Sequence, residues 1–162
     1  MSAEFYEAQL KRVSQTFTDI VAIRTAPVET VPGDPDALNA APTADDFQMA
    51  TTAYQLILEQ IESYHHQCSV AIGDYRSIND EWMKDIRKMS GADKAAEQQA
   101  NTAAHATLNL DSLFRQAQAK LRDFGTIIIT LKANIRKCEK IRTNCTCSTS
   151  SSSSCSSDNI RI

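Results

Sequence analysis

Apolar residues recur along this chain at alternating spacings of three and four, from Phe47 without a break to Met89. This period is typical of a helix that buries one stripe of its surface against partner helices. A second run with the same spacing extends from Leu110 to Cys138, after an interruption near residue 90. The two runs predict two long helices that fold back on each other as an antiparallel hairpin. We expect its interaction seam to contain Tyr54, Ile57, Ile61, Cys68, Ile72, Tyr75, Trp82, Ile86, Leu110, Phe114, Leu121, Phe124, Ile128, Leu131 and Ile135.

A shorter amphipathic helix is expected before the hairpin, because apolar residues from Tyr6 to Ile20 follow the same spacing. All prolines of the chain lie between residues 25 and 43, and proline cannot continue a helix. After residue 143 the chain consists mostly of Ser, Thr and Cys, which bury too little to offset the entropy of ordering. Four parts follow: an N-terminal amphipathic helix (1–24), a Pro-rich linker (25–43), a long helical hairpin (44–143) and a disordered Ser/Cys-rich tail (144–162).

Composition supports an all-α fold, namely an elongated three-helix, coiled-coil-like bundle built on this hairpin. The chain has 162 residues, 42% of them hydrophobic, which is enough for one domain with a core. Only 6% are aromatic, and there are 4 glycines and 4 prolines, too few for an architecture of strands and turns.

Charge, hydropathy and cysteine content limit the class of partner. A net charge of -3 argues against a chain that holds nucleic acid through its overall field. No apolar run approaches the roughly 18 to 20 residues that a bilayer requires, and the first ten residues do not resemble an export signal. We therefore expect a cytoplasmic protein without a membrane partner. Its 5 cysteines, if reduced, fit that compartment, and their odd number argues against a closed disulfide framework.

Residues that could carry chemistry are few, so we predict neither an enzyme nor a cofactor. There is no glycine-rich phosphate loop, no nucleophile elbow and no framed carboxylate pair. His65, His66 and Cys68 form the densest group of potential metal ligands, but no second ligand pair accompanies them. The other four cysteines, between residues 138 and 155, match no zinc-binding spacing. A buried Cys68 beside a solvated histidine is the favoured interpretation, and no metal is expected.

The end of the second long helix is basic. Cations there complement the helix dipole, which accounts for them without any ligand. A contact with RNA or with an acidic partner stays open as an alternative, although no aromatic stacking platform accompanies the charges. The residues concerned are Lys132, Arg136, Lys137, Lys140 and Arg142.

The order of segments resembles the N-terminal region of BEL/Pao-type retrotransposon Gag polyproteins. The matching features are the short helix from Phe5 to Ile23, a Pro/Asp-rich link, the segment Ile78-Asn79-Asp80-Glu81-Trp82, the basic exit Lys137-Cys138-Glu139-Lys140 and a Ser-rich tract. The likeness covers about residues 1 to 157 and lacks the Leu-, Pro- and Phe-rich stretch that follows in that family. It implies a structural segment that helps Gag to self-associate, with RNA packaging and proteolysis assigned to later parts of a longer polyprotein.

Periodicity and resemblance both favour a non-enzymatic domain for structure or self-association, with a further copy of itself as its partner. The alternative is a cytosolic adaptor or tethering bundle that holds a partner helix in a groove. Seams of this kind can join two helices of one chain or helices of two chains. The pattern therefore leaves open whether the hairpin closes within one chain or is exchanged between two copies.

Overall fold

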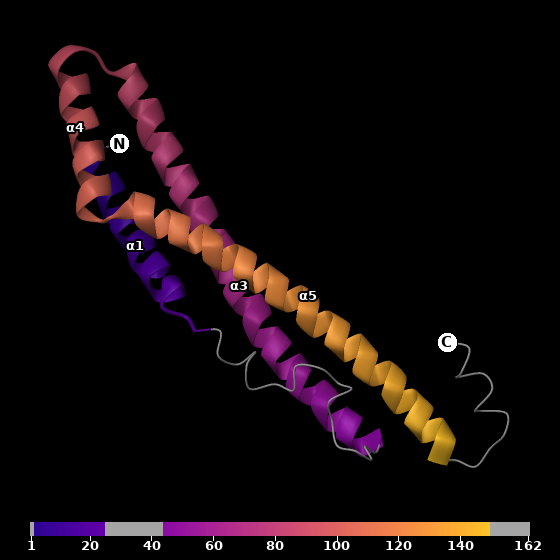
Figure 1. Cartoon of the computed structure of the whole chain (residues 1–162). Coiled ribbons are helices and arrows are strands. Elements are labelled where there is room, and N and C mark those ends of the chain that lie inside the picture. Colours follow the sequence, from indigo (N-terminus) through magenta and orange to yellow (C-terminus); the bar gives the residue numbers. More distant parts are fainter. Residues whose placement is uncertain (1, 25–43, 150–162) are drawn as a thin grey trace. The chain divides into compact units, whose positions relative to one another are not determined.

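The structure is a computed structural model that describes residues 2–24 and 44–149 (Figure 1). Its helices are α1 (Ala3–Val21), α3 (Ala44–Lys88), α4 (Gly91–Thr107) and α5 (Leu110–Thr149). No strand occurs in these two ranges, so the predicted all-α class is confirmed. The predicted linker, residues 25–43, lies outside the described residues.

Helix α5 ends later than we expected. The hairpin was predicted to end at residue 143, but α5 continues through residues 144–149. Adding a residue to an existing helix costs far less than starting one, so a long helix can extend into a polar sequence. The rest of the predicted tail, residues 150–162, lies outside the described residues.

A break at Asn109 divides what we expected to be one continuous third helix into α4 and α5. Asn109 has a φ of 53°, in the left-handed region that asparagine tolerates better than most residues. The Asn109 amide donates to the Ala106 carbonyl at 3.2 Å, and its own carbonyl accepts from the Leu113 amide at 3.1 Å. Asn109 thus ends one helix and starts the next, and residues 2–24 and 44–149 form four helices where the pattern suggested three.

The described chain forms two compact units, and α3 and α5 contribute to both. Unit 1 contains α1, α4 and residues 63–88 and 110–124 of the two long helices. Its centre is aromatic: the ring centroids of Tyr75 and Phe114 lie 4.8 Å apart, and Phe17 lies 5.9 Å from Tyr75. The core comprises Tyr6, Leu10, Val13, Phe17, Ile20, Cys68, Ala71, Ile72, Tyr75, Trp82, Ile86, Ala104, Leu110, Ala117 and Phe124.

Unit 2 contains the described residues 44–62 of α3 and 125–149 of α5. The hydroxyl of Thr51, which is also buried, donates to the Phe47 carbonyl at 2.8 Å, so this polar group is satisfied within its own helix. The apolar core here comprises Phe47, Ala50, Tyr54, Ile61, Leu131, Ile135 and Cys138.

The predicted seam lies inside the chain. Each of its residues is buried, except that Ile57, Phe114, Leu121 and Ile128 are half-buried. Within unit 1, contacts such as that between the rings of Tyr64 and Phe124, 5.9 Å apart, join α3 to α5 of the same chain. In this structure the seam is therefore occupied by contacts within the chain.

We predict that Ile61→Asp lowers the free energy of unfolding by about 3 kcal/mol or more, because Ile61 has no exposed surface and the new charge would have no partner. The matched control is Ile129→Asp, also in unit 2, where the side chain is 70% exposed and the change should stay within about 0.5 kcal/mol. Urea denaturation followed by circular dichroism measures both. Equal losses in the two variants would contradict the seam assignment.

We also predict that Asn109→Gly leaves the melting temperature nearly unchanged, whereas Asn109→Val lowers stability by about 1–2 kcal/mol. The reason is the positive φ of Asn109, which glycine adopts freely and a β-branched residue does not. Thermal denaturation of the two variants checks this. A valine variant as stable as the glycine variant would show that the left-handed turn is not required.

Candidate interaction surfaces

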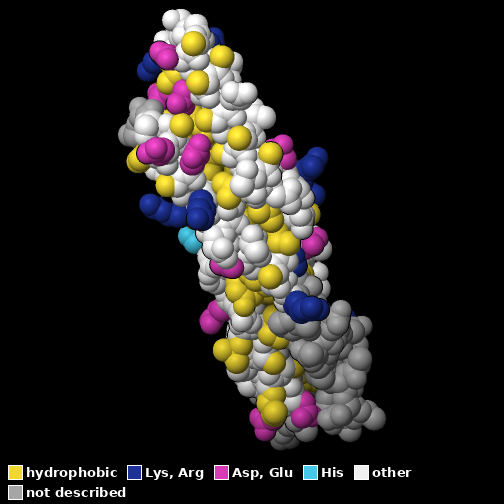
Figure 2. All heavy atoms as spheres, turned by 90° about the vertical axis from the view of Figure 1, so that its left-hand side faces the viewer, with side chains coloured by type: hydrophobic (Ala, Val, Ile, Leu, Met, Phe, Trp, Pro, Cys, Tyr) yellow, Lys and Arg dark blue, Asp and Glu magenta, His cyan; other side chains and the backbone are white. Residues whose placement is uncertain are grey.

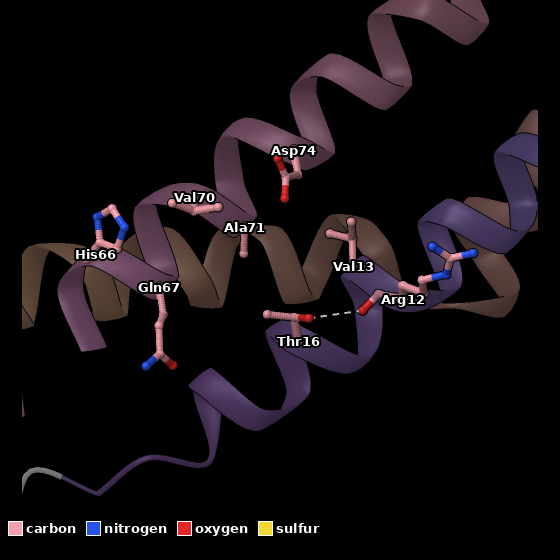
Figure 3. A pocket seen from close by; sticks show the side chains of 8 residues that line it. All are labelled: Arg12, Val13, Thr16, His66, Gln67, Val70, Ala71 and Asp74. Carbon is pink, nitrogen blue, oxygen red and sulfur yellow. Dashed lines mark hydrogen bonds between the residues drawn. The ribbon is translucent and has the colours of Figure 1, made fainter. Parts of the chain in front are cut away.

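The surface of unit 1 is hollowed along the line where α1 lies beside α3. Three hollows of about 370, 300 and 380 Å³ follow one another along this line, and Figure 3 shows the first. They adjoin because neighbouring hollows share lining residues, which are Arg12, Val13 and Asp74 at one junction and Gln9, Ser77 and Ile78 at the other. We call this continuous depression the α1–α3 groove. On α3 it extends from His66 to Asp85, about 28 Å at 1.5 Å per residue.

The floor of the α1–α3 groove is apolar. Val13 of α1 and Ala71 of α3 are buried and point into the space between the two helices (Figure 3). Val70 stands beside them and is 46% exposed, and Phe5 at the far end is 41% exposed. Few large apolar side chains are this exposed in the described chain, so the groove offers apolar surface that no described helix covers.

The charged residues along the groove are mostly acidic. Asp74, Glu81 and Asp85 line it from α3, against Arg12 from α1. No ion pair joins Arg12 to Asp74, and the Arg12 guanidinium points away from Asp74 in Figure 3. Glu81 lies 3.4 Å from Lys84, but both side chains are 58% exposed, so water screens this pair. The groove therefore attracts positive charge.

A buried aromatic stack holds the acidic end of the groove in place. The rings of Tyr6 and Trp82 are nearly parallel, at 10°, with centroids 5.4 Å apart. The Tyr6 hydroxyl donates to Asp85 Oδ2 at 2.5 Å, and Trp82 Nε1 donates to Glu97 Oε2 of α4 at 2.8 Å. Burial and then the Asp85 hydrogen bond raise the pKa of Tyr6 to about 12. The same bond lowers the pKa of Asp85, whose carboxyl group is ionised at neutral pH with or without this shift.

A second apolar stripe lies on the part of α3 that belongs to unit 2. Met49 and Leu56 are 71% and 63% exposed, and Ala53 lies between them at spacings of four and three. We call these three residues the α3 outer stripe. Figure 2 shows that hydrophobic side chains do reach the surface of the described chain. The stripe was not predicted from the sequence, because the stronger seam on the same helix dominates the pattern, although the spacing itself is present.

The predicted basic residues lie along α5 in unit 2. Lys132, Arg136, Lys137 and Lys140 are all exposed, while the side chain of Arg142 is not among those described. Lys132 Nζ lies 3.9 Å from Glu62, a long and exposed ion pair. Positions 129, 133, 136 and 140 fall within an arc of about 60° on one face of the helix. We call this face the α5 basic stripe; it consists of Ile129, Ala133, Arg136 and Lys140.

The histidines and Cys68 do not converge into a metal site. Cys68 is buried, and its thiol donates to the Ala117 carbonyl at 3.2 Å; burial also raises the pKa of this thiol. His65 is half-buried, whereas His66 is exposed at the rim of the α1–α3 groove. Within residues 2–24 and 44–149, no three His, Cys, Asp or Glu side chains are grouped so that they could hold a metal ion.

His105, which the sequence analysis did not single out, forms a half-buried polar pair with Tyr75. Its Nδ1 lies 2.8 Å from the Asn101 carbonyl, so this nitrogen carries the proton. The other nitrogen, Nε2, then accepts a hydrogen bond from the Tyr75 hydroxyl, 3.1 Å away. The bond at Nδ1 lies within α4, so it is the Nε2–Tyr75 contact that joins α4 to α3. No helix among the described ones is long and apolar enough to cross a membrane.

We predict that the protein loses stability as the pH rises from 10 towards 12, and that Tyr6→Phe reduces this loss. A pKa raised from 10.0 to about 12 means that the folded state retains the Tyr6 proton after the unfolded state has lost it, so the stabilisation present below pH 10 disappears through this window. Urea denaturation of both proteins at pH 8, 10 and 11 measures the difference. Identical pH profiles would show that the Tyr6 hydroxyl is not held as the structure places it.

Comparison with protein-family models, curated proteins and solved structures finds no match to this chain. No relative therefore supplies a function or a site residue, and the resemblance to Gag polyproteins stays a prediction. Among the described residues, the surfaces that offer contacts to another molecule are the α1–α3 groove, the α3 outer stripe and the α5 basic stripe.

Proposed function

We propose that this chain is a non-enzymatic helical domain that assembles with further copies of itself. The observation that carries the proposal is the α3 outer stripe, whose Met49 and Leu56 stay largely exposed although the seam on the same helix is buried. Removing apolar surface from water contributes roughly 25 cal/mol per Å², so a stripe of this kind favours association.

The spacing of the stripe supports a second copy as the partner. Met49, Ala53 and Leu56 follow the four-three spacing with which helices pack side by side in coiled coils. Two copies present identical stripes, and a two-fold symmetric contact between them is the commonest form of homo-oligomer. The resemblance to N-terminal Gag regions agrees with this proposal, and we propose a Gag-derived assembly segment as its origin.

We also propose that the protein is located in the cytoplasm. Cys68 and Cys138 are buried thiols that form no disulfide in the described chain, and the reducing cytoplasm keeps thiols in this state. The competing proposal is a cytosolic adaptor, which the α1–α3 groove supports because amphipathic helices bind in apolar grooves of this kind.

The test is the solution mass of the full chain over a concentration series, measured by light scattering after size-exclusion chromatography under reducing conditions. We expect reversible growth to dimers or larger species, and a smaller mass at each concentration for the double variant Met49→Glu/Leu56→Glu. The matched control is Gln48→Glu/Gln55→Glu, which adds the same charge at two exposed positions of the same helix, also seven residues apart.

A wild-type chain that remains monomeric throughout would overturn self-association and favour the adaptor. Growth that the Met49/Leu56 and Gln48/Gln55 variants show equally would place association on a surface other than the α3 outer stripe.

A further inference from the structure

We propose that the α5 basic stripe of one copy binds in the α1–α3 groove of a second copy. This inference rests on the self-association proposed above and adds a second contact to it, one that joins two different surfaces. Its occupant is residues 129–140 of α5, and its receptor is the face of α3 from Val70 to Glu81 together with α1.

Charge complementarity is the first argument. The groove carries the carboxylates of Asp74 and Glu81, and that of Asp85, which the Tyr6 hydroxyl already engages, against one guanidinium, Arg12. The α5 basic stripe carries Arg136 and Lys140, which are exposed, and neither lies within ion-pairing distance of an acidic side chain of the described chain. Opposite fields on two surfaces steer encounter and fix which partners fit.

Apolar complementarity is the second argument. The stripe begins with Ile129, which is 70% exposed, and the groove begins with the apolar floor of Val13 and Ala71 beside the exposed Val70. When the exposed isoleucine enters this hollow of about 370 Å³, the apolar surfaces of both are removed from water, which favours binding. The apolar match lies at one end of the two surfaces, and the match of opposite charges lies at the other.

The spacing of the residues is the third argument, because it lets both ends fit at once. The stripe residues 129, 133, 136 and 140 are separated by four, three and four positions. Val70, Asp74, Ser77 and Glu81, all of which line the groove, are separated in the same way. A parallel alignment with Ile129 beside Val70 therefore brings Lys140 beside Glu81, about 16 Å further along, and sets Arg136 beside Ser77, within one turn of Asp74. The reverse direction would place Ile129 against the charged Glu81 and Lys140 against the apolar Val70, and would keep a single favourable pair, Arg136 beside Asp74.

Because groove and stripe differ, the contact is heterologous: each copy that fills a neighbour's groove still offers its own groove to a third. Assembly through this contact extends from copy to copy or closes into a ring. The α3 outer stripe, by contrast, pairs like with like. Two contacts of these two kinds would connect chains in more than one direction.

The experiment uses charge reversal in the full chain. Asp74→Lys/Glu81→Lys disables the groove, and Arg136→Glu/Lys140→Glu disables the stripe. For each double variant alone, the dissociation constant of the assembly should rise about tenfold or more. Light scattering and sedimentation at low salt measure this change. Mixing the two should restore assembly, because the unchanged stripe of one variant meets the unchanged groove of the other, and the reversed groove meets the reversed stripe. The quadruple variant should recover extended assembly.

The matched control is Asp80→Lys/Asp123→Lys, which reverses two exposed carboxylates of unit 1 outside the groove and changes the net charge equally. Circular dichroism establishes that every variant is folded. Reversal variants that assemble like the wild type, while Met49→Glu/Leu56→Glu does not, would overturn this inference and leave the proposed function intact. Failure of the mixture to form a complex would also overturn it.

Treatment with nuclease distinguishes docking of α5 in the groove from the remaining alternative, which is that the α5 basic stripe binds nucleic acid. Association of the wild-type chain that disappears after nuclease digestion would assign the α5 basic stripe to nucleic acid and overturn the docking of α5 in the groove. Association that persists after digestion, and that follows the pattern of the charge reversals, supports it. A monomeric wild-type chain at every concentration would overturn this inference and the proposed function together.

Discussion

Each helix of this chain can bury only one stripe of its surface, and this limit decides which side chains remain available to other molecules. The alternating spacing of three and four places every buried position of α3 on one side of the helix. Within each unit those positions face partners from the same chain, so the strongest apolar pattern in the sequence stabilises the fold. Other surfaces therefore have to carry any function in assembly.

Unit 1 shows how packing creates such a surface. Phe17 of α1 reaches the aromatic centre formed with Tyr75, while Tyr6 stacks on Trp82 and donates to Asp85. These contacts hold α1 beside α3 along its length, and the space that the two convex helices leave between them is the α1–α3 groove. The same contacts hold the Asp85 carboxylate at the groove's end, so the packing of the core also positions charge on the surface.

Unit 2 offers different chemistry. Its part of α3 exposes Met49 and Leu56, and its part of α5 exposes Ile129 with Arg136 and Lys140. Neither set is needed for the core, because Tyr54, Ile61 and Leu131 are buried without it. Contacts between chains are formed by apolar and basic side chains at regular spacing on the outside of a helix. The distribution of surface chemistry between the two units is thus the physical basis of the assembly that we propose.

The sequence alone determined the all-α class and the buried seam, because burial of a helix follows directly from the period of its apolar residues. It also contained the signal for the break at Asn109, but asparagine in the left-handed conformation cannot be told from asparagine within a helix without knowing the backbone. The extension of α5 through residues 144–149 went against composition, because an established helix lengthens at little cost. Only the tertiary structure decided where the hollows lie and which carboxylates share them, since Gln9 and Arg12 meet Asp74 and Ser77 through packing across more than 60 residues of chain. Periodicity within a helix is local and can be read from the chain, whereas the surface between two helices depends on where each one lies.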